Sequence, residues 1–405
     1  MVASGSKGVL PGSGSRPIVI LGAGYAGLTA ARELNRRLKG KLPVVLVDRL
    51  PVHVLRTELY EVGRLARSQT PAAEWTLPLA SVLAKTSVEF HQGTVLSIDL
   101  GGRSVELEKE VLPFGALAIC LGNVPAYYGV PGAREHTFEI YRLEGARRLA
   151  QALLEMEQRS ANLRGERRPR VVVVGGGATG TELAAEIATE DWQQLAGPSA
   201  RTPEVVLLTG SQPFLEGLPK RFARRAESVL HRAGVTVVRG YNVTEVRAGS
   251  LRTEDGSTYA CDLAVWCAGL EAPEVVRKIE VPHGRGGRLI VGPTLEVPGH
   301  PGVFGVGDVA EIPAGKPGAV VPATAQAAIE EGRVVAQNML NRLQGREPLE
   351  FTYRERGVFL ALGQGEGAGQ VRTVPVWGSP AALLKRLLQR EYSRAVRAGS
   401  SRGIL

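Results

Sequence analysis

The stretch from Pro17 to Asp48 constrains the fold of this 405-residue chain more than any other. An apolar run of strand length, 18–21, leads into glycines spaced G-x-G-x-x-G, and a helix-patterned segment follows. A second apolar run, 44–47, then ends in the acid Asp48, about 20 residues after the last glycine. This order of strand, glycine turn, helix, strand and acid predicts a βαβ unit that binds a dinucleotide. The alternative is an ordinary βαβ unit with a glycine-rich turn.

Each part of this fingerprint has a physical role in holding a pyrophosphate. Gly22 permits the tight turn, Gly24 lets the backbone approach the phosphates, and Gly27 allows the helix to pack closely on the strand. The helix N-terminus offers free N–H groups and the positive end of the helix dipole. Asp48 is expected to accept hydrogen bonds from the ribose hydroxyls of an adenosine.

A second copy of the pattern lies in the middle of the chain. It consists of an apolar run, three glycines, a helix pattern and a second apolar run: 170–174, Gly175, Gly177, Gly180, 181–189 and 205–208. Two dinucleotide fingerprints in one chain form an internal repeat, and each copy strengthens the interpretation of the other.

The end of the chain returns to the first unit. A strand, a glycine turn and an acid over 303–308 precede a helix pattern over 323–343 and strand patterns at 351–353 and 358–361. The second unit is therefore expected to be inserted in the first. The predicted fold is α/β, with two Rossmann-like domains and a redox cofactor at their seam. The expected segments are a disordered leader, a discontinuous first domain, an inserted second domain and a basic amphipathic tail: 1–16, 17–139 with 286–375, 140–285 and 376–405.

Composition and charge exclude several classes of protein. The sequence has no run of 18 or more uncharged apolar residues, so no membrane-spanning segment is expected. The leader, rich in glycine and serine, lacks the apolar core of a secretory signal. Cys120, Cys261 and Cys267 make no disulfide framework, which fits a reducing compartment. A net charge of +9 favours anionic partners, but zinc spacings and nucleic-acid motifs are absent from the sequence. Neither a metal site nor a nucleic-acid partner is expected.

Five motifs carry a resemblance to a known family: 22–27, 175–183, 266–269, 305–308 and 325–330. Together they resemble the flavoprotein reductases that have two dinucleotide-binding domains. Within these, the chain most resembles the type II NADH dehydrogenases, single-chain NADH:quinone oxidoreductases of the membrane surface. The likeness covers about residues 17 to 375; the glycine motifs are shared by all relatives, whereas the block that begins with Ala325 and Gln326 and the basic tail are more specific.

The resemblance implies FAD on the first fingerprint and NADH or NADPH, as a substrate, on the second. Asp308 would accept hydrogen bonds from the flavin ribityl hydroxyls, and Gly122 would let the backbone approach the flavin. Val95 would contact the adenine through its backbone, and Gly269 and Ala325 would also contribute to cofactor binding. The plain alternatives are a turn-capping Asp308, a Gly122 that ends a strand and a Val95 that is merely buried.

Glu182 lies in the first turn of the second nucleotide helix. It matches a family glutamate near the nicotinamide and flavin rings, so the resemblance implies a catalytic role. An acid at a helix start can equally compensate the helix dipole.

The chain departs from the family at the end of the second strand of the inserted unit. NADH-binding relatives carry Glu there for the ribose diol, whereas this chain has Thr209. A hydroxyl does not repel a 2′-phosphate, so the preference between NADH and NADPH is open. Arg201 and Arg221 are basic candidates for a 2′-phosphate, with solvated surface charges as the alternative.

The quinone motif of the family, Ala-Gln-x-x-x-Gln, is also altered. Gln326 is retained and can donate to a quinone oxygen, but Glu330 replaces the second Gln one helical turn on. Ionised, Glu330 would repel the quinone oxygens. Beside an apolar tunnel its pKa should rise, and the protonated acid could deliver a proton to the quinol. The alternative is a solvated helix residue.

The tail from 379 to 405 is patterned as one amphipathic helix with a frayed end. An apolar stripe recurs at three- and four-residue steps: Leu384, Leu387, Leu388, Tyr392, Ala395 and Val396. Basic residues take the remaining faces: Lys385, Arg386, Arg390, Arg394 and Arg397. This pattern predicts a helix that lies on an anionic membrane surface, peripherally and on the cytoplasmic face of the cell membrane. Packing on the protein or on a partner subunit is the alternative, and monomer or homodimer stays open.

The sequence therefore predicts a non-proton-pumping, FAD-dependent NAD(P)H:quinone oxidoreductase, in which the protein positions the reactants and the flavin does the chemistry. A sulfide:quinone oxidoreductase is the redox alternative, but it needs a pair of redox thiols beside the flavin. A nucleotide-binding redox-regulatory protein without catalysis is the alternative from another class.

Overall fold

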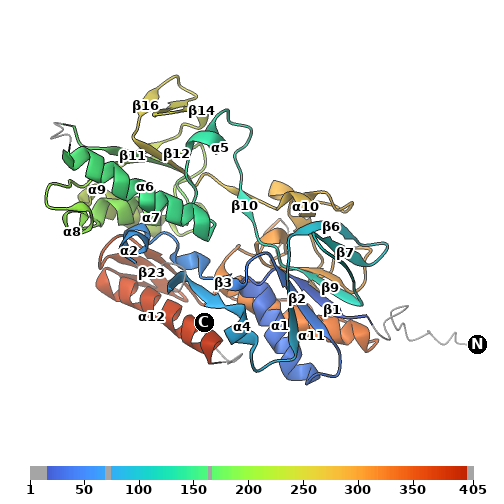
Figure 1. Ribbon diagram of the computed structural model, residues 1–405. Helices are drawn as coiled ribbons and strands as arrows, with labels where there is room; N and C mark the ends of the chain where they lie inside the picture. Colours follow the sequence, from blue (N-terminus) through green and yellow to red (C-terminus); the bar gives the residue numbers. More distant parts are fainter. Residues whose placement is uncertain (1–15, 69–73, 163–166, 317, 399–405) are drawn as a thin grey trace, which may run out of the picture.

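The computed structural model describes residues 16–68, 74–162, 167–316 and 318–398 (Figure 1). All of the expected disordered leader except Arg16 lies outside these residues, as does the end of the tail. Across the described ranges, no helix has the length and apolar character needed to cross a membrane. Two parallel sheets, each packed with helices, form the body of the molecule.

The first fingerprint lies in a five-stranded parallel sheet of order β20-β9-β1-β2-β5. The strands are, in that order, Val303–Gly305, Ala116–Ile119, Ile18–Leu21, Val44–Asp48 and Val88–Gln92. β1 and β9 are buried throughout, as expected for parallel strands covered on both faces. α1 (Tyr25–Leu38) packs against α11 (Ala325–Leu343), and Gly332 leaves room there for the backbone of Ala26.

The second fingerprint lies in a four-stranded parallel sheet of order β13-β12-β11-β17. Its strands are Thr236–Arg239, Glu204–Thr209, Arg170–Val174 and Leu263–Trp266. The helices around it are α6 (Leu143–Asn162), α7 (Ala178–Thr189), α8 (Trp192–Ala196) and α9 (Lys220–Arg232). Both fingerprints therefore form the predicted strand–turn–helix–strand units.

The second unit is inserted in the first, as the sequence predicts. β20, which follows the whole second sheet in the chain, pairs with β9 of the first sheet. The chain leaves through β10 (Val124–Pro125) and returns through β18 (Leu270–Glu271), and these two short strands pair antiparallel. The fold class is thus confirmed, and the exact domain boundaries stay predictions.

Smaller elements surround the two sheets. Five small sheets comprise β3 (Val52–Val54) with β4 (Thr76–Pro78); β6 (Val95–Asp99), β7 (Ser104–Leu107) and β8 (Val111–Pro113); β14 (Val243–Arg247), β15 (Ser250–Thr253) and β16 (Thr258–Ala260); β19 (Leu289–Ile290) with β21 (Ala310–Glu311); and β22 (Gly357–Ala361), β23 (Gly367–Val371) and β24 (Val374–Trp377). The short helices are α2 (Val62–Arg67), α4 (Leu79–Leu83), α5 (Ala133–His136) and α10 (Glu274–Arg277), with 3₁₀ turns η1 (Arg56–Glu58), η2 (Arg285–Gly287) and η3 (Gly307–Val309).

The β22–β24 sheet differs from the sequence-based assignment. Residues up to 375 were expected to belong to the first domain, but Leu360, Leu362 and Ala368 join the hydrophobic core of the second unit. The expected strand at 351–353 does not form. Alternating apolar residues predict a strand but do not indicate which core it packs against.

The C-terminal helix α12 (Ser379–Arg397) crosses both units (Figure 1). Its first part packs on β22 and β23, and Tyr392 and Val396 enter the core of the first unit. The predicted apolar stripe therefore largely faces the protein, because apolar side chains close to a core are buried against it. The face left exposed carries two leucines and four arginines: Leu383, Leu387, Arg386, Arg390, Arg394 and Arg397.

Candidate active site

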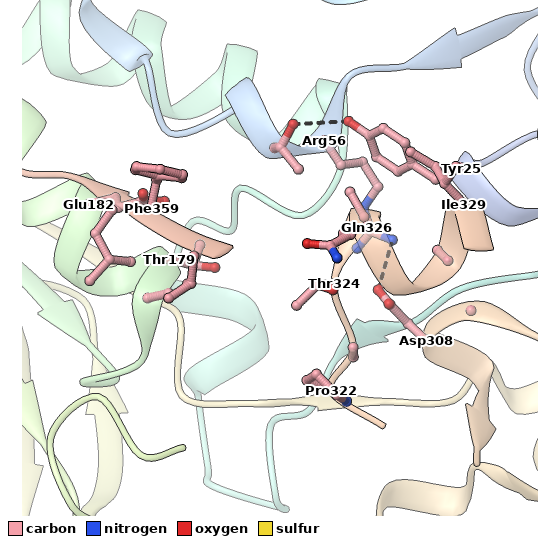
Figure 2. Close-up of a pocket in the computed structure, with 18 of the residues that line it drawn as sticks. Tyr25, Arg56, Thr179, Glu182, Asp308, Pro322, Thr324, Gln326, Ile329 and Phe359 are labelled. Atoms are coloured by element: carbon pink, nitrogen blue, oxygen red, sulfur yellow. Dashed lines mark hydrogen bonds and ion pairs between the residues drawn. The ribbon is translucent and has the colours of Figure 1, made fainter. Parts of the chain in front are cut away.

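A cavity of about 580 Å³ lies where the two units and α12 meet. Figure 2 shows Glu182, Thr179 and Phe359 on one side of it, facing Tyr25, Arg56 and Gln326 across open space. The cavity is bordered by the starts of both fingerprint helices, by the start of α11 and by one face of α12. It therefore lies at the seam that the sequence predicted.

The first glycine turn is open toward this cavity. Gly24 is the N-cap of α1 and has no side-chain cap, and a Cβ built on it would meet no atom within 4 Å. Gly22 has a φ of +99°, and Gly27 leaves no space for a side chain against Gly22. Unsatisfied N–H groups beside empty space fit a pyrophosphate.

Asp48 ends β2 beside this turn, as expected. Its carboxylate accepts hydrogen bonds from the N–H groups of Ala23, at 2.7 Å, and Leu50, at 2.9 Å. Burial raises its pKa. The carboxylate thus braces the glycine turn, and ribose binding stays a prediction. Val95 begins β6 and packs against the first core, so its adenine contact also stays a prediction.

A polar network lies on the side of the cavity formed by the first unit. Asp308 accepts a hydrogen bond from Asn123, at 2.8 Å, and its carboxylate lies 3.9 Å from the guanidinium of Arg56 (Figure 2). Gly122 lines the same wall, and a Cβ there would lie 3.2 Å from that guanidinium. In the 3₁₀ turn η3, which carries Asp308, the Gly307 N–H donates to the buried Glu331, at 2.5 Å. Burial raises the pKa of Glu331 to about 7.

The second glycine turn repeats the first in detail. Gly177 caps α7 without a side-chain hydrogen bond, and a Cβ on it would again meet open space. Gly175 has a φ of +119°, and Gly180 packs against its backbone. Gly269 follows β17, where the Tyr128 hydroxyl occupies the position that a Cβ would need. The second turn can therefore hold a second pyrophosphate.

Thr209 is buried at the end of β12, with its side chain against Gly176. Arg221 donates to Gln370, at 2.8 Å, and Arg201 precedes β12 at the opposite end of the strand. Arg201 therefore lies away from Thr209, whereas a role of Arg221 toward a 2′-phosphate stays a prediction. Arg239, which sequence reasoning did not consider, pairs in register with Thr209 on the neighbouring strand, and its guanidinium is ion-paired with Glu227, at 2.7 Å.

Glu182 lines the cavity and is held by two groups. Its carboxylate accepts from the Ala361 N–H, at 2.9 Å, and is ion-paired with Lys385 of α12. The Lys385 ammonium also lies 4.3 Å from the ring centre of Tyr60. Lys385 was expected on the basic outer face. Its spacing to Ala381, Leu388 and Tyr392 puts it on their helix face, and this signal was available in the sequence.

Gln326 and Glu330 have different surroundings. Gln326 lines the cavity and donates to the Arg354 carbonyl, at 3.2 Å, which leaves one amide hydrogen free. Glu330 is not among the described residues that line the cavity, and its carboxylate lies 3.1 Å from the Arg356 guanidinium. The two residues of the altered quinone motif thus have different surroundings, and proton delivery by Glu330 stays a prediction.

The three cysteines are buried and unbonded. Cys120 and Cys267 occupy equivalent places in the two units, each against the third glycine of its fingerprint. Burial raises the pKa of Cys120, and raises that of Cys267 to about 12, so both stay protonated thiols. Among the described residues, no cluster of His, Cys, Asp or Glu could hold a metal ion.

Comparison with known proteins gives three results. The family model for pyridine nucleotide-disulphide oxidoreductases matches residues 16–332. A type II NADH:quinone oxidoreductase of Staphylococcus aureus is 28% identical over 387 residues, covering 92% of this chain and 94% of the relative. Among solved structures, NDH2 from Plasmodium falciparum in complex with NADH has a TM-score of 0.81 at 15% identity, covering 95% of this chain and 96% of that one. The sulfide:quinone oxidoreductase of Aquifex aeolicus has a TM-score of 0.77 at 20% identity, covering 96% and 92%.

Proposed function

Because the chain belongs to the pyridine nucleotide-disulphide oxidoreductase family, we propose that it is an FAD-dependent NAD(P)H:quinone oxidoreductase. The predicted resemblance to type II NADH dehydrogenases is confirmed at the level of family by relatives that carry that name. Beyond the family, we propose that the protein binds FAD, takes electrons from a pyridine nucleotide and reduces a membrane quinone.

One observation carries the proposal. Two glycine turns, each at an uncapped helix start, open toward a single cavity that neither turn fills with its own side chains. Such turns bind pyrophosphates through backbone N–H groups. FAD would be held by the turn at Gly24 together with Asp308, and NAD(P)H by the turn at Gly177. When bound, FAD supplies two-electron transfer between the nucleotide and an acceptor.

Apolar residues on both sides of the cavity fit a lipophilic acceptor. Ile329, Phe359 and Leu388 are apolar, whereas Gln326 offers a free amide hydrogen to a quinone oxygen. Among the described residues, the cavity wall is formed partly by α12, whose outer face exposes leucines and arginines. That outer face would lie on anionic lipid at the cytoplasmic face of the membrane, so that quinone enters beside it.

Two glycine variants test the assignment of the turns. The backbone at Gly24 (φ −71°, ψ −166°) and Gly177 (φ −77°, ψ −179°) is extended, so valine can be accommodated there without strain. Gly24→Val should fold but purify colourless, because the side chain fills the pyrophosphate space. Gly177→Val should stay yellow but resist anaerobic bleaching by NADH and NADPH. A bleached Gly177→Val, or a yellow Gly24→Val, contradicts the assignment.

The wild-type protein tests the reaction itself. It should be yellow, bleach anaerobically with NADH or NADPH and recolour with a quinone. Sulfide should leave it yellow, because the buried thiols of Cys120 and Cys267 provide no redox pair. A protein that binds flavin but resists bleaching by both nucleotides would instead be the non-catalytic regulatory protein.

A further inference from the structure

We propose that Glu58 is the carboxylic acid that protonates the bound quinone, an inference that rests on the proposed function. Glu58 ends the 3₁₀ turn η1 and lines the cavity in which we place the acceptor. Its side chain was not a candidate in the sequence, because an acid in a loop before a helix has no distinguishing pattern.

The turn that carries Glu58 is held from three sides. The indole N–H of the fully buried Trp75 donates to the Glu58 carbonyl, at 3.2 Å. The neighbouring Thr57 is hydrogen-bonded to Tyr25 of α1, at 3.0 Å, and to Gln389 of α12, at 3.3 Å. The turn of Glu58 is thus tied to α1 and α12, two of the helices that border the cavity.

The carboxyl itself is buried and makes no hydrogen bond or ion pair within the described part of the chain. Glu58 is only 8% exposed. Burial, followed by the charge of Glu61, raises its pKa to about 7. Four charged or titratable groups face it from the surrounding elements: Glu61, Arg64, Lys385 and Tyr25. Arg64 and Lys385 lower the pKa, but by less than burial raises it.

The reaction requires one proton in addition to the hydride that NAD(P)H supplies. NAD(P)H, quinone and one proton give NAD(P)⁺ and quinol, so electrons and atoms balance only with a proton from water. A hydride equivalent, carrying two electrons and one proton, reaches the quinone as the reduced cofactor is reoxidised. The O–H bond of Glu58 then breaks as the second O–H bond of the quinol forms. The Glu58 carboxylate then regains a proton from water that reaches it beside Arg64, whose side chain is 47% exposed.

Stopped-flow measurement of the two half-reactions tests this role in flavin-loaded protein. Wild-type recolouring by quinone should slow as the pH rises through about 7, because the acid form is lost. Glu58→Gln should recolour roughly a hundredfold more slowly than wild type below that pH and converge with it above, with no pH dependence of its own. Bleaching by NAD(P)H should be unchanged. A Glu58→Gln variant that keeps the wild-type pH profile overturns the proposal.

Glu61→Gln is the matched control. It makes the same change of Glu to Gln about one turn away from Glu58, at a residue that is not among the described residues lining the cavity. It should keep the acid-dependent step but shift it to lower pH, because a negative neighbour is lost. Infrared spectroscopy gives a readout without turnover. Below the pH of their transitions, the resting wild type and Glu61→Gln should show one protonated carboxylic acid band more than Glu58→Gln, beside the bands expected of Glu186 and Glu331. Unchanged bands in Glu58→Gln contradict the proposal. A wild type that NAD(P)H cannot bleach removes the proposed function and this inference with it.

Discussion

Lys385 of the C-terminal helix is ion-paired with Glu182 of the second nucleotide helix, inside the cavity between the two units. Their side chains are only 12% and 10% exposed. The pair joins the proposed membrane-facing helix to the residue that the family resemblance places near the nicotinamide and flavin rings. The C-terminal helix therefore forms part of the candidate active site.

Lys385→Met should destabilise the protein, because it leaves the buried carboxylate of Glu182 without its cation. Breaking a buried pair in this way costs about 3–5 kcal/mol. The double variant Lys385→Met with Glu182→Gln should recover much of the loss, since the amide carries no charge and can still accept from the Ala361 N–H. Thermal unfolding of both variants and of Arg386→Gln, an exposed neighbour, measures this. Additive losses in the double variant would show that the pair contributes nothing.

Tyr392→Phe should loosen the contact between α12 and the first glycine turn. The Tyr392 hydroxyl donates to His53, at 3.1 Å, and His53 donates through its other ring nitrogen to the Ala23 carbonyl, at 2.8 Å. Burial lowers the pKa of His53 to about 4, so the ring is neutral and Nε2 accepts. Without the hydroxyl, the buried Nε2 has no donor, at a cost of about 1–3 kcal/mol.

The expected result is a lower Tm and faster loss of flavin from Tyr392→Phe. Ser393→Ala, at the next and more exposed position, should match wild type in both measurements. Wild-type flavin retention in Tyr392→Phe would mean that α12 and the glycine turn are independent.

The two parallel sheets were predictable because each has an unambiguous local signature. Runs such as 171–174 are too apolar for anything but a covered strand, and the following glycines fix the turn. The open starts at Gly24 and Gly177 follow from the same pattern. Much of the site could therefore be located from the spacing of a few glycines and one acid.

The remaining features depend on tertiary packing that no local pattern contains. Which face of α12 is buried depends on the apolar surfaces within its reach. Tyr392 and Val396 pack in the core of the first unit. Lys385 was assigned by its charge rather than its helical position. Glu330 was expected at the quinone because it replaces a motif residue, but Arg356 holds its carboxylate. A residue on a separate element, such as Glu58, reaches the site only after folding.

Arg239→Gln should reduce the use of NADPH selectively. Arg239 is the register partner of Thr209, and its guanidinium lies 5.1 Å from the ring centre of Phe214, which packs by the second glycine turn. A charge-assisted contact with the 2′-phosphate would contribute about 1.5–3 kcal/mol, so the KM for NADPH should rise roughly tenfold or more. The KM for NADH should stay unchanged, as should both values in Arg232→Gln on α9. Equal effects on the two nucleotides would place Arg239 away from the phosphate.

Glu186→Gln should make the protein less sensitive to alkaline pH. Burial, then the charges of Glu61 and Glu190, raises the pKa of Glu186 to about 8, against the lowering effects of Arg67 and Arg386. The folded state then binds more protons than the unfolded state between the ordinary value, 4.5, and about 8. Stability is therefore complete below the lower value and is lost as the pH rises through the higher one.

The measurement is the Tm of wild type and Glu186→Gln across this range. Near about pH 5 the two should agree within a degree or so, because Glu186 is protonated in the folded protein. Near about pH 9 the variant should be more stable by an amount on the order of a few kcal/mol, since each pKa unit corresponds to about 1.4 kcal/mol. Glu155→Gln, an exposed glutamate on α6, should follow wild type throughout. A wild-type Tm that is flat with pH, or a variant that loses stability in parallel with it, would mean that Glu186 is ionised in the fold.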